Sequence, residues 1–145
     1  MNQRERMTQL YSAISKTNEI YEAWAKKNGL SYIEMTLFYD LAEYEGEPVT
    51  QKQLCVDLVL SKTTVNSVVK KYIKMGYLEL QSIPDNKKEK WVALTAQGRK
   101  FVDQLIMPLF HLEEEIISTI SDEQLNQAEN TLNLYSQQLE ERLLK

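Results

Sequence analysis

The chain has 145 residues, of which 43% are hydrophobic and 26% charged, with one cysteine and one histidine. That length suits one domain with a core of its own, and a single cysteine excludes an internal disulfide. One histidine and one cysteine also argue against a dedicated zinc site. The longest apolar run is far shorter than the about 20 residues of a membrane-spanning helix, and the N-terminus lacks the apolar segment of a secretory signal. We expect a cytoplasmic protein with no membrane partner, no metal and no cofactor.

Charge is unevenly distributed along the chain, although the net charge is only −4. Residues 48–100 hold ten Lys or Arg against four Asp or Glu, a net charge of +6. The two flanks hold the other 7 basic and 17 acidic residues, a net charge of −10. A basic centre of this kind indicates a nucleic-acid-binding surface, with a merely solvated face as the alternative.

Capping patterns and glycines delimit the predicted helices. The capping-box pattern begins at four positions, which are Ser31, Thr50, Ser121 and, more weakly, Ser61. Glycines suited to a left-handed helix end are Gly29, Gly46 and Gly76. Between these marks the apolar spacing predicts helices over residues 4–28, 32–45, 51–58, 62–75, 96–120 and 122–144. Pro108 should bend or interrupt the fifth of them.

Two β-prone segments, 77–81 and 90–94, flank a polar turn at 82–89 and predict a hairpin. Two short helices followed by a hairpin make up the winged helix-turn-helix arrangement. We therefore predict a mainly α (α+β) fold, a winged helix-turn-helix with long N- and C-terminal dimerisation helices. Its parts are an N-terminal dimerisation helix (1–29), a DNA-binding lobe (30–100) and C-terminal dimerisation helices (101–145), in one structural domain overall. The basic centre coincides with the lobe.

The helix predicted at 62–75 has an apolar stripe and a polar face that contains no acid. Ordinary exposed faces mix both signs of charge, whereas basic and hydroxyl side chains suit a helix in the DNA major groove. Hydroxyl groups and Asn66 can reach base edges, and the lysines suit phosphates. The candidate DNA-binding residues here are Ser61, Lys62, Thr63, Thr64, Asn66, Ser67, Lys70 and Lys71.

The turn of the predicted hairpin adds three candidates, Asp85, Lys87 and Lys88. A basic wing can follow the DNA backbone and place a cation in the adjacent minor groove. Phosphate would repel Asp85, so we expect this residue to orient the turn or a neighbouring base through a hydrogen bond.

These motifs together resemble the MarR (multiple antibiotic resistance regulator) family of transcription factors. The matching segments are 49–54, 60–69, 75–78, 84–87 and 92–98, and the long end helices extend the resemblance to nearly the whole chain. The resemblance implies an obligate homodimer, built from the N- and C-terminal helices, whose two winged lobes bind a pseudo-palindromic operator.

The chain departs from the family's pattern at three positions where arginine is common. These positions hold Lys87 in the wing, Ser67 in the recognition helix and Leu80 after the first wing strand. Lysine keeps the charge but loses the forked geometry of arginine. We therefore expect DNA binding that depends on phosphate contacts, with a changed sequence readout.

The end helices carry more apolar residues than a small winged lobe can bury. Burial against a second copy would cover them and set two recognition helices one DNA turn, ~34 Å, apart. A helical hairpin packed on itself in a monomer is the alternative. The candidate dimer-interface residues are Leu10, Ile14, Tyr21, Ile116, Ile120, Leu132, Tyr135, Leu139 and Leu143.

The resemblance also implies a small aromatic or phenolic ligand between the dimer helices and the lobe. The residues that would line its pocket are Tyr11, Trp24, Tyr32, Phe38, Tyr39, Phe110 and His111. A place for these aromatics in the core is the alternative, and nothing in the sequence selects a ligand. Cys55 is expected to be a small buried residue rather than a redox sensor.

The combined prediction is a sequence-specific DNA-binding transcriptional regulator, a ligand-responsive repressor that acts as a homodimer. A ligand would change the spacing of the two lobes, so that they no longer fit successive major grooves. The alternative is a winged-helix protein–protein interaction module with weak or lost DNA binding, which the missing arginines favour. An enzyme is not indicated, because no nucleotide loop, paired catalytic carboxylates or nucleophile–histidine set is present.

Overall fold

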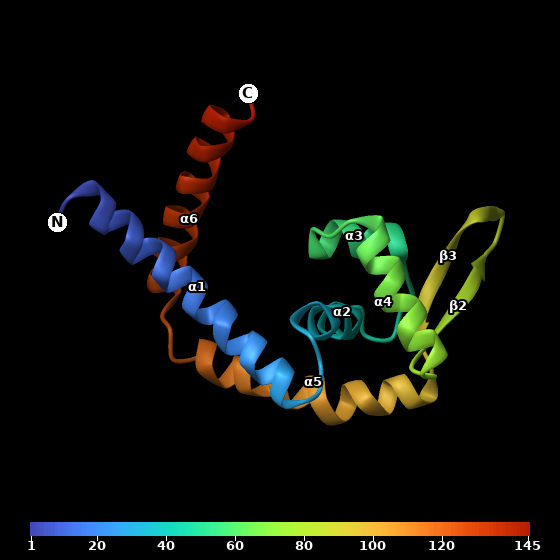
Figure 1. The fold of residues 1–145 in the computed structure, drawn as a ribbon. Coiled ribbons are helices and arrows are strands. Elements are labelled where there is room, and N and C mark those ends of the chain that lie inside the picture. The colour runs from blue at the N-terminus through green and yellow to red at the C-terminus, as the bar shows by residue number, and fades with distance from the viewer. The chain divides into compact units, whose positions relative to one another are not determined.

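The computed structural model describes all 145 residues and contains six helices and one three-stranded sheet (Figure 1). The helices are α1 (Gln3–Lys27), α2 (Tyr32–Glu43), α3 (Gln51–Leu58), α4 (Lys62–Lys74), α5 (Ala96–Ile117) and α6 (Asp122–Leu143). The strands are β1 (Val49–Thr50), β2 (Leu78–Ile83) and β3 (Asn86–Leu94), antiparallel in the order β1-β3-β2. This is the predicted winged helix fold. None of the helices combines the length and the apolar character needed to cross a membrane.

Local capping chemistry explains where the helices begin. Ser31 and Ser121 form complete capping boxes at α2 and α6, while Thr50 and Ser61 cap α3 and α4 through their hydroxyl groups alone. Asn2 forms a further capping box at α1, which the sequence analysis did not identify. The predicted helix ends were less accurate. Helix α2 stops two residues early, since the chain turns with positive φ at residues 45 and 46.

The β2–β3 hairpin is tighter and longer than predicted. Ile83 pairs with Asn86, so that only Pro84 and Asp85 form the loop. Asp85 has φ of 61°, the left-handed conformation that suits the position after a turn proline. Strand β3 therefore begins at Asn86 instead of near residue 90. The two-residue β1 was not predicted, because so short a strand has no detectable alternation.

The aromatic core lies where α2, α4, the start of α5 and the sheet meet. Phe38 of α2 is fully buried, and its ring centroid lies 4.8 Å from that of Tyr72 and 4.9 Å from that of Phe101. Edge-to-face packing of this kind adds stability beyond the area that it buries. The other large, fully buried side chains are Leu37, Leu54, Val65, Val69, Leu78, Val92, Val102 and Ile106.

A close backbone approach joins the hairpin to α5. The Thr95 hydroxyl donates to the Gly76 carbonyl at 2.6 Å and accepts from the Gly98 amide at 3.0 Å. A Cβ atom at Gly98 would lie 2.0 Å from the Tyr77 carbonyl oxygen, so only glycine fits there. This packing gives a structural reason for the residue types in the segment 92–98.

The chain divides into two compact units, residues 1–106 and 107–145, which we call the N-terminal and C-terminal units. The sequence suggested one structural domain whose C-terminal part begins at residue 101. That division stays a prediction. The boundary between the two compact units falls inside α5, which Pro108 does not interrupt, since the helix continues to Ile117. Beyond residue 107 only Leu109 belongs to the buried core, and every residue of α6 is exposed.

A carboxylate pair lies at the junction of α2 and α3. Asp57 of α3 accepts a 2.5 Å hydrogen bond from the Tyr44 hydroxyl and a 2.7 Å bond from the Gln53 amide. Asp40 of α2 has a buried Oδ2 with no hydrogen-bond partner. Burial, the neighbouring Asp57 and the charge of Glu43 raise the pKa of Asp40 to about 7.

We predict that Asp40 makes the fold less stable as the pH rises from 5 to 8. The unfolded chain loses this proton near its ordinary pKa of 3.8, whereas folded Asp40 keeps it up to about 7, so folding takes up a proton between these values. The Asp40→Asn variant should therefore gain stability relative to the wild type as the pH rises. Urea unfolding at pH 5 and pH 8 measures this difference. An equal difference at both pH values would contradict the prediction.

Candidate nucleic-acid interface

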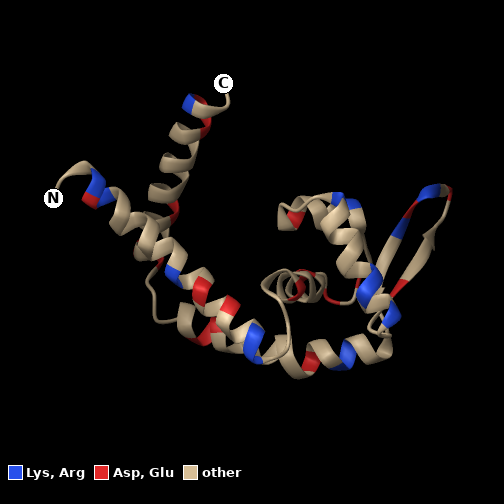
Figure 2. Ribbon diagram, viewed as in Figure 1, with Lys and Arg blue, Asp and Glu red and all other residues tan.

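Helix α4 presents a basic and hydroxyl face to solvent. Its buried side consists of Val65, Val69 and Tyr72, which pack into the core. The exposed residues opposite this stripe are Thr63, Ser67, Lys70 and Lys74. No acidic residue lies on α4, and Figure 2 shows basic positions along this helix and at the end of the hairpin. The amphipathic pattern thus directs these polar side chains outward together.

Two candidate hydroxyls at the start of α4 are used within the helix cap. The Ser61 Oγ accepts the Thr64 amide at 3.1 Å and lies 2.9 Å from the Thr64 Oγ1. Lys62 and Thr63 follow with exposed side chains, and Asn66 is half-buried. The N-terminus of α4 therefore offers backbone amides and a lysine side chain, which together favour an anion.

The Asn86 side chain organises the wing. Its Oδ1 accepts the backbone amides of Lys88 at 3.0 Å and Glu89 at 3.1 Å, across the irregular register that follows Ser82. Lys87 and Lys88 are exposed next to the two-residue loop. Asp85 adopts the left-handed backbone conformation that the two-residue loop requires. The side-chain hydrogen bonds that we expected from Asp85 are made by Asn86. The sequence analysis missed this role, although asparagine next to a turn is a typical signal for it.

One candidate DNA-binding lysine is bound within the protein. Lys71 Nζ lies 2.6 Å from Glu34 Oε2 at the first turn of α2. Burial raises the pKa of Glu34, but hydrogen bonds from Lys71, Tyr72 and Ser31 outweigh it and lower this pKa to about 2. The capping-box pattern that begins at Ser31 includes Glu34 and predicts only a capping role for it, because the contact with Lys71 spans 37 positions and has no local signal.

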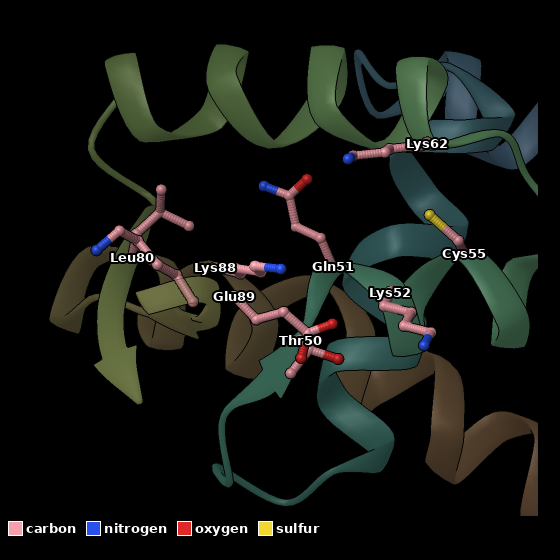
Figure 3. Close-up of a pocket in the computed structure, with 9 residues that line it drawn as sticks. Thr50, Gln51, Lys52, Cys55, Lys62, Leu80, Lys88 and Glu89 are labelled. Atoms are coloured by element: carbon pink, nitrogen blue, oxygen red, sulfur yellow. The ribbon is translucent and has the colours of Figure 1, made fainter. Parts of the chain in front are cut away.

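A cavity of about 470 Å³ separates α3 and the start of α4 from the hairpin (Figure 3). Figure 3 shows Gln51 and Lys62 extending into it from the helices and Lys88 from the hairpin. Cys55, which is half-buried, and Leu80 contribute to its walls. The full lining is Thr50, Gln51, Lys52, Cys55, Lys62, Leu80, Lys88, Glu89 and Lys90. Four lysines against one glutamate give the lining of this cavity a positive charge, which favours anions.

The residues expected to line an aromatic ligand pocket occupy different environments. Phe38 is fully buried in the aromatic core, which leaves no surface for a ligand. Tyr11 is exposed on α1, and Trp24, Tyr32 and Tyr39 are half-buried within the N-terminal unit. In the C-terminal unit, Phe110 is half-buried and His111 is exposed. Neither this basic cavity nor a second cavity beside α2 and α4 is lined by any of these residues.

The residues expected at a dimer interface remain accessible in the single chain. Leu10 and Tyr21 of α1 are half-buried, while Ile14 is exposed. In the C-terminal unit, Ile116 is 55% exposed and Leu143 is 70% exposed. Four more exposed candidates in the same unit are Ile120, Leu132, Tyr135 and Leu139.

Comparison with known proteins identifies the class of the chain. A family profile described as "Winged helix DNA-binding domain" matches residues 30–98. The chain is 26% identical over 91 residues to YwoH of Bacillus subtilis, described as an uncharacterized HTH-type transcriptional regulator. That alignment covers 63% of this chain and 66% of the relative, slightly less than two thirds of its length. Residues 30–98 are thus similar in sequence to winged helix DNA-binding domains.

Solved structures that are similar over nearly the whole chain define its fold more closely than the profile does. NMB1585, a MarR family regulator from Neisseria meningitidis, has a TM-score of 0.79 at 22% identity, covering 99% of this chain and 97% of that one. MepR of S. aureus, solved as a complex with DNA, has a TM-score of 0.70 at 16% identity, covering 92% and 97%. The chain therefore has the winged helix fold of these two proteins, which is the fold that the resemblance in the sequence implied. The matching relative is itself described as a transcriptional regulator, and the matching solved structures share the fold of this chain.

We predict that Asn86→Ala loosens the wing without disturbing the rest of the fold. The variant leaves the Lys88 and Glu89 amides without their acceptor, at a cost of about 1–2 kcal/mol for the two bonds. Hydrogen exchange followed by NMR should show faster exchange at these two amides. The remaining amides of β3 serve as the internal reference. Unchanged exchange at residues 88 and 89 would show that the turn does not depend on this side chain.

Proposed function

We propose that this protein is a cytoplasmic, homodimeric transcriptional regulator that binds double-stranded DNA with α4 in the major groove and the hairpin as a wing. The observation that carries this proposal is the exposed face of α4, which has lysine and hydroxyl side chains and no acid. A DNA groove favours this composition, because phosphates line both of its edges. Thr63 and Ser67 have the side chains to meet base edges, and Lys70 suits the backbone.

The basic cavity supports the same orientation. It lies between α4 and the wing, and DNA backbone passing from the major groove to the minor groove would run across it. Lys62 and Lys88 would then contact phosphates from two sides, with Lys87 next to the minor groove. Because none of these side chains is a forked guanidinium, we expect the affinity for DNA to depend strongly on salt. Base contacts should contribute only modestly to this affinity.

The exposed apolar residues of the C-terminal unit support a homodimer. Ile116, Leu139 and other apolar side chains of α5 and α6 are exposed in the single chain. Many exposed apolar side chains on two helices favour an interface, and a two-fold axis would pair the same surface on two copies.

The proposed activity is that of a repressor released by a small ligand. Binding of an aromatic or phenolic compound would stabilise a dimer in which the lobes are spaced incorrectly for DNA. The half-buried aromatics of α1 and α2 are candidates for its contacts, while the burial of Phe38 in the core argues against a direct contact there.

We predict salt-dependent DNA binding that depends on the wing and on the start of α4. Fluorescence anisotropy with a pool of duplexes, including the region upstream of the protein's own gene, measures affinity at several salt concentrations. In a dimer, Lys62→Ala or Lys88→Ala removes two phosphate contacts, so the slope of log K against log salt should flatten by about 1.8. Lys16→Ala, which removes an exposed lysine from α1, is the matched control and should leave the slope unchanged.

Uniformly weak, salt-insensitive binding to every duplex would overturn this proposal. That result would favour a winged-helix module that binds another protein, an alternative supported by Ser67 and Leu80 at positions where the family often has arginine.

We predict that one buried charge on α6 dissociates the dimer. Leu139→Asp places a carboxylate among the apolar residues proposed to meet the second copy, and sedimentation should show half the wild-type mass. Asn130→Asp introduces the same charge on the opposite side of the helix, by its spacing, and should leave the dimer intact. Far-UV circular dichroism confirms that both variants stay helical. A dimeric Leu139→Asp protein would place the interface elsewhere.

A further inference from the structure

A buried carboxylate on α2 pairs with a lysine of the proposed recognition helix. The Glu34 side chain is only 10% exposed, whereas that of its partner Lys71 is 55% exposed. Three groups donate to the Glu34 carboxylate, namely the Ser31 amide at 2.9 Å, Lys71 Nζ at 2.6 Å and the Tyr72 hydroxyl. Glu34 therefore connects the start of α2 with two successive residues of α4.

Lys71 lies away from the centre of the exposed face of α4. Thr63, Ser67, Lys70 and Lys74 lie opposite the buried stripe, at helical spacing. Lys71 lies at the edge facing α2, where it lines a cavity of about 460 Å³ together with Ser31, Glu34 and the α4 residues next to it. Its ammonium group is also 5.4 Å from the centre of the Tyr72 ring, which favours the cation in this position.

The energetics oppose transfer of Lys71 from Glu34 to a DNA phosphate. Loss of the lysine would leave a buried carboxylate without its counter-charge, and the penalty for that is large. A phosphate contact at the solvent-exposed edge of the helix is screened by salt, so its favourable free energy is smaller than that penalty. The adjacent Lys70 is exposed and has no ion pair, so no such penalty applies to it.

We infer that Glu34 is a positioning residue of the DNA interface, which retains Lys71 as a structural link between α2 and α4 and withholds it from DNA. Lys70 then supplies the phosphate contact from this turn of the helix. The link fixes the rotation of α4 about its own axis and reduces binding to arbitrary sequences, because one cation fewer is offered to the backbone. This inference rests on the proposed function in DNA binding.

A comparison of the two neighbouring lysines tests the inference. Lys70→Met and Lys71→Met remove the same charge one residue apart and keep a side chain of similar length. The salt dependence of binding to a random-sequence duplex is measured by anisotropy for each dimer. Lys70→Met should flatten the slope of log K against log salt by about 1.8, for two lost phosphate contacts. Lys71→Met should leave the slope unchanged and lower the urea midpoint of unfolding.

The Glu34→Gln variant tests the same inference from the other side. Glutamine can still accept the Ser31 amide in the capping box, so the helix cap is kept. The released Lys71 should then reach the backbone, which would steepen the salt slope by about 1.8 and tighten binding to random duplex. The Glu34→Gln/Lys71→Met double variant removes the buried charge with its partner. It should recover the stability lost in Lys71→Met and return the slope to the wild-type value.

The outcomes separate this inference from the proposed function. If the wild-type slope is close to zero, the proposed DNA binding fails and this inference fails with it. A steep wild-type slope that Lys71→Met and Lys70→Met flatten equally would overturn the inference alone, since Lys71 would then be a phosphate contact. An unchanged slope in Glu34→Gln would also overturn it.

Discussion

The edge-to-face contact between Phe38 and Tyr72 determines which side of α4 meets solvent. Phe38 is fully buried, and Tyr72 belongs to the only apolar stripe on α4. While these rings pack together, Thr63, Ser67 and Lys70 must point outward, because they lie on the opposite side of the same helix. Tyr77 and Phe101 complete the cluster and attach the hairpin and α5 to it. The proposed DNA-binding surface is thus a consequence of apolar packing behind it.

The ion pair between Glu34 and Lys71 adds to the packing that orients α4. Glu34 lies beside the aromatic cluster and accepts hydrogen bonds from both Lys71 and Tyr72, so a charge contact and a ring contact hold the same turn of α4. The chain has a net charge of −4, yet residues 48–100 have a net charge of +6, and Figure 2 shows basic positions on α4 and on the hairpin. An acidic chain can therefore present a cationic surface, because local rather than net charge sets the field that a ligand meets.

The two units bury apolar surface to different extents. The N-terminal unit encloses a continuous core, whereas the C-terminal unit leaves most of the apolar side chains of α6 exposed. Each Å² of apolar surface removed from water contributes about 25 cal/mol, so an unpaired helix of this composition gives up much of its possible stabilisation. A second copy supplies the missing contacts in our proposal. The same association would place two recognition helices for one operator.

The amino-acid sequence alone determined the order of the helices and the hairpin, the starts of helices α2 to α6 and the choice of face on α4. These features depend on residues within a few positions of one another, as in the caps at Ser31 and Ser61. Only the tertiary structure decided that Lys71 is bound by Glu34, that Asp40 lies beside Asp57, and that the lysines of α3, α4 and the wing surround one cavity. Each of these contacts joins residues far apart in the chain, and local periodicity carries no information about distant partners. The two-residue loop at Pro84 and Asp85 was predicted only in part. The turn residues can be recognised in the sequence, but the register of the two strands cannot.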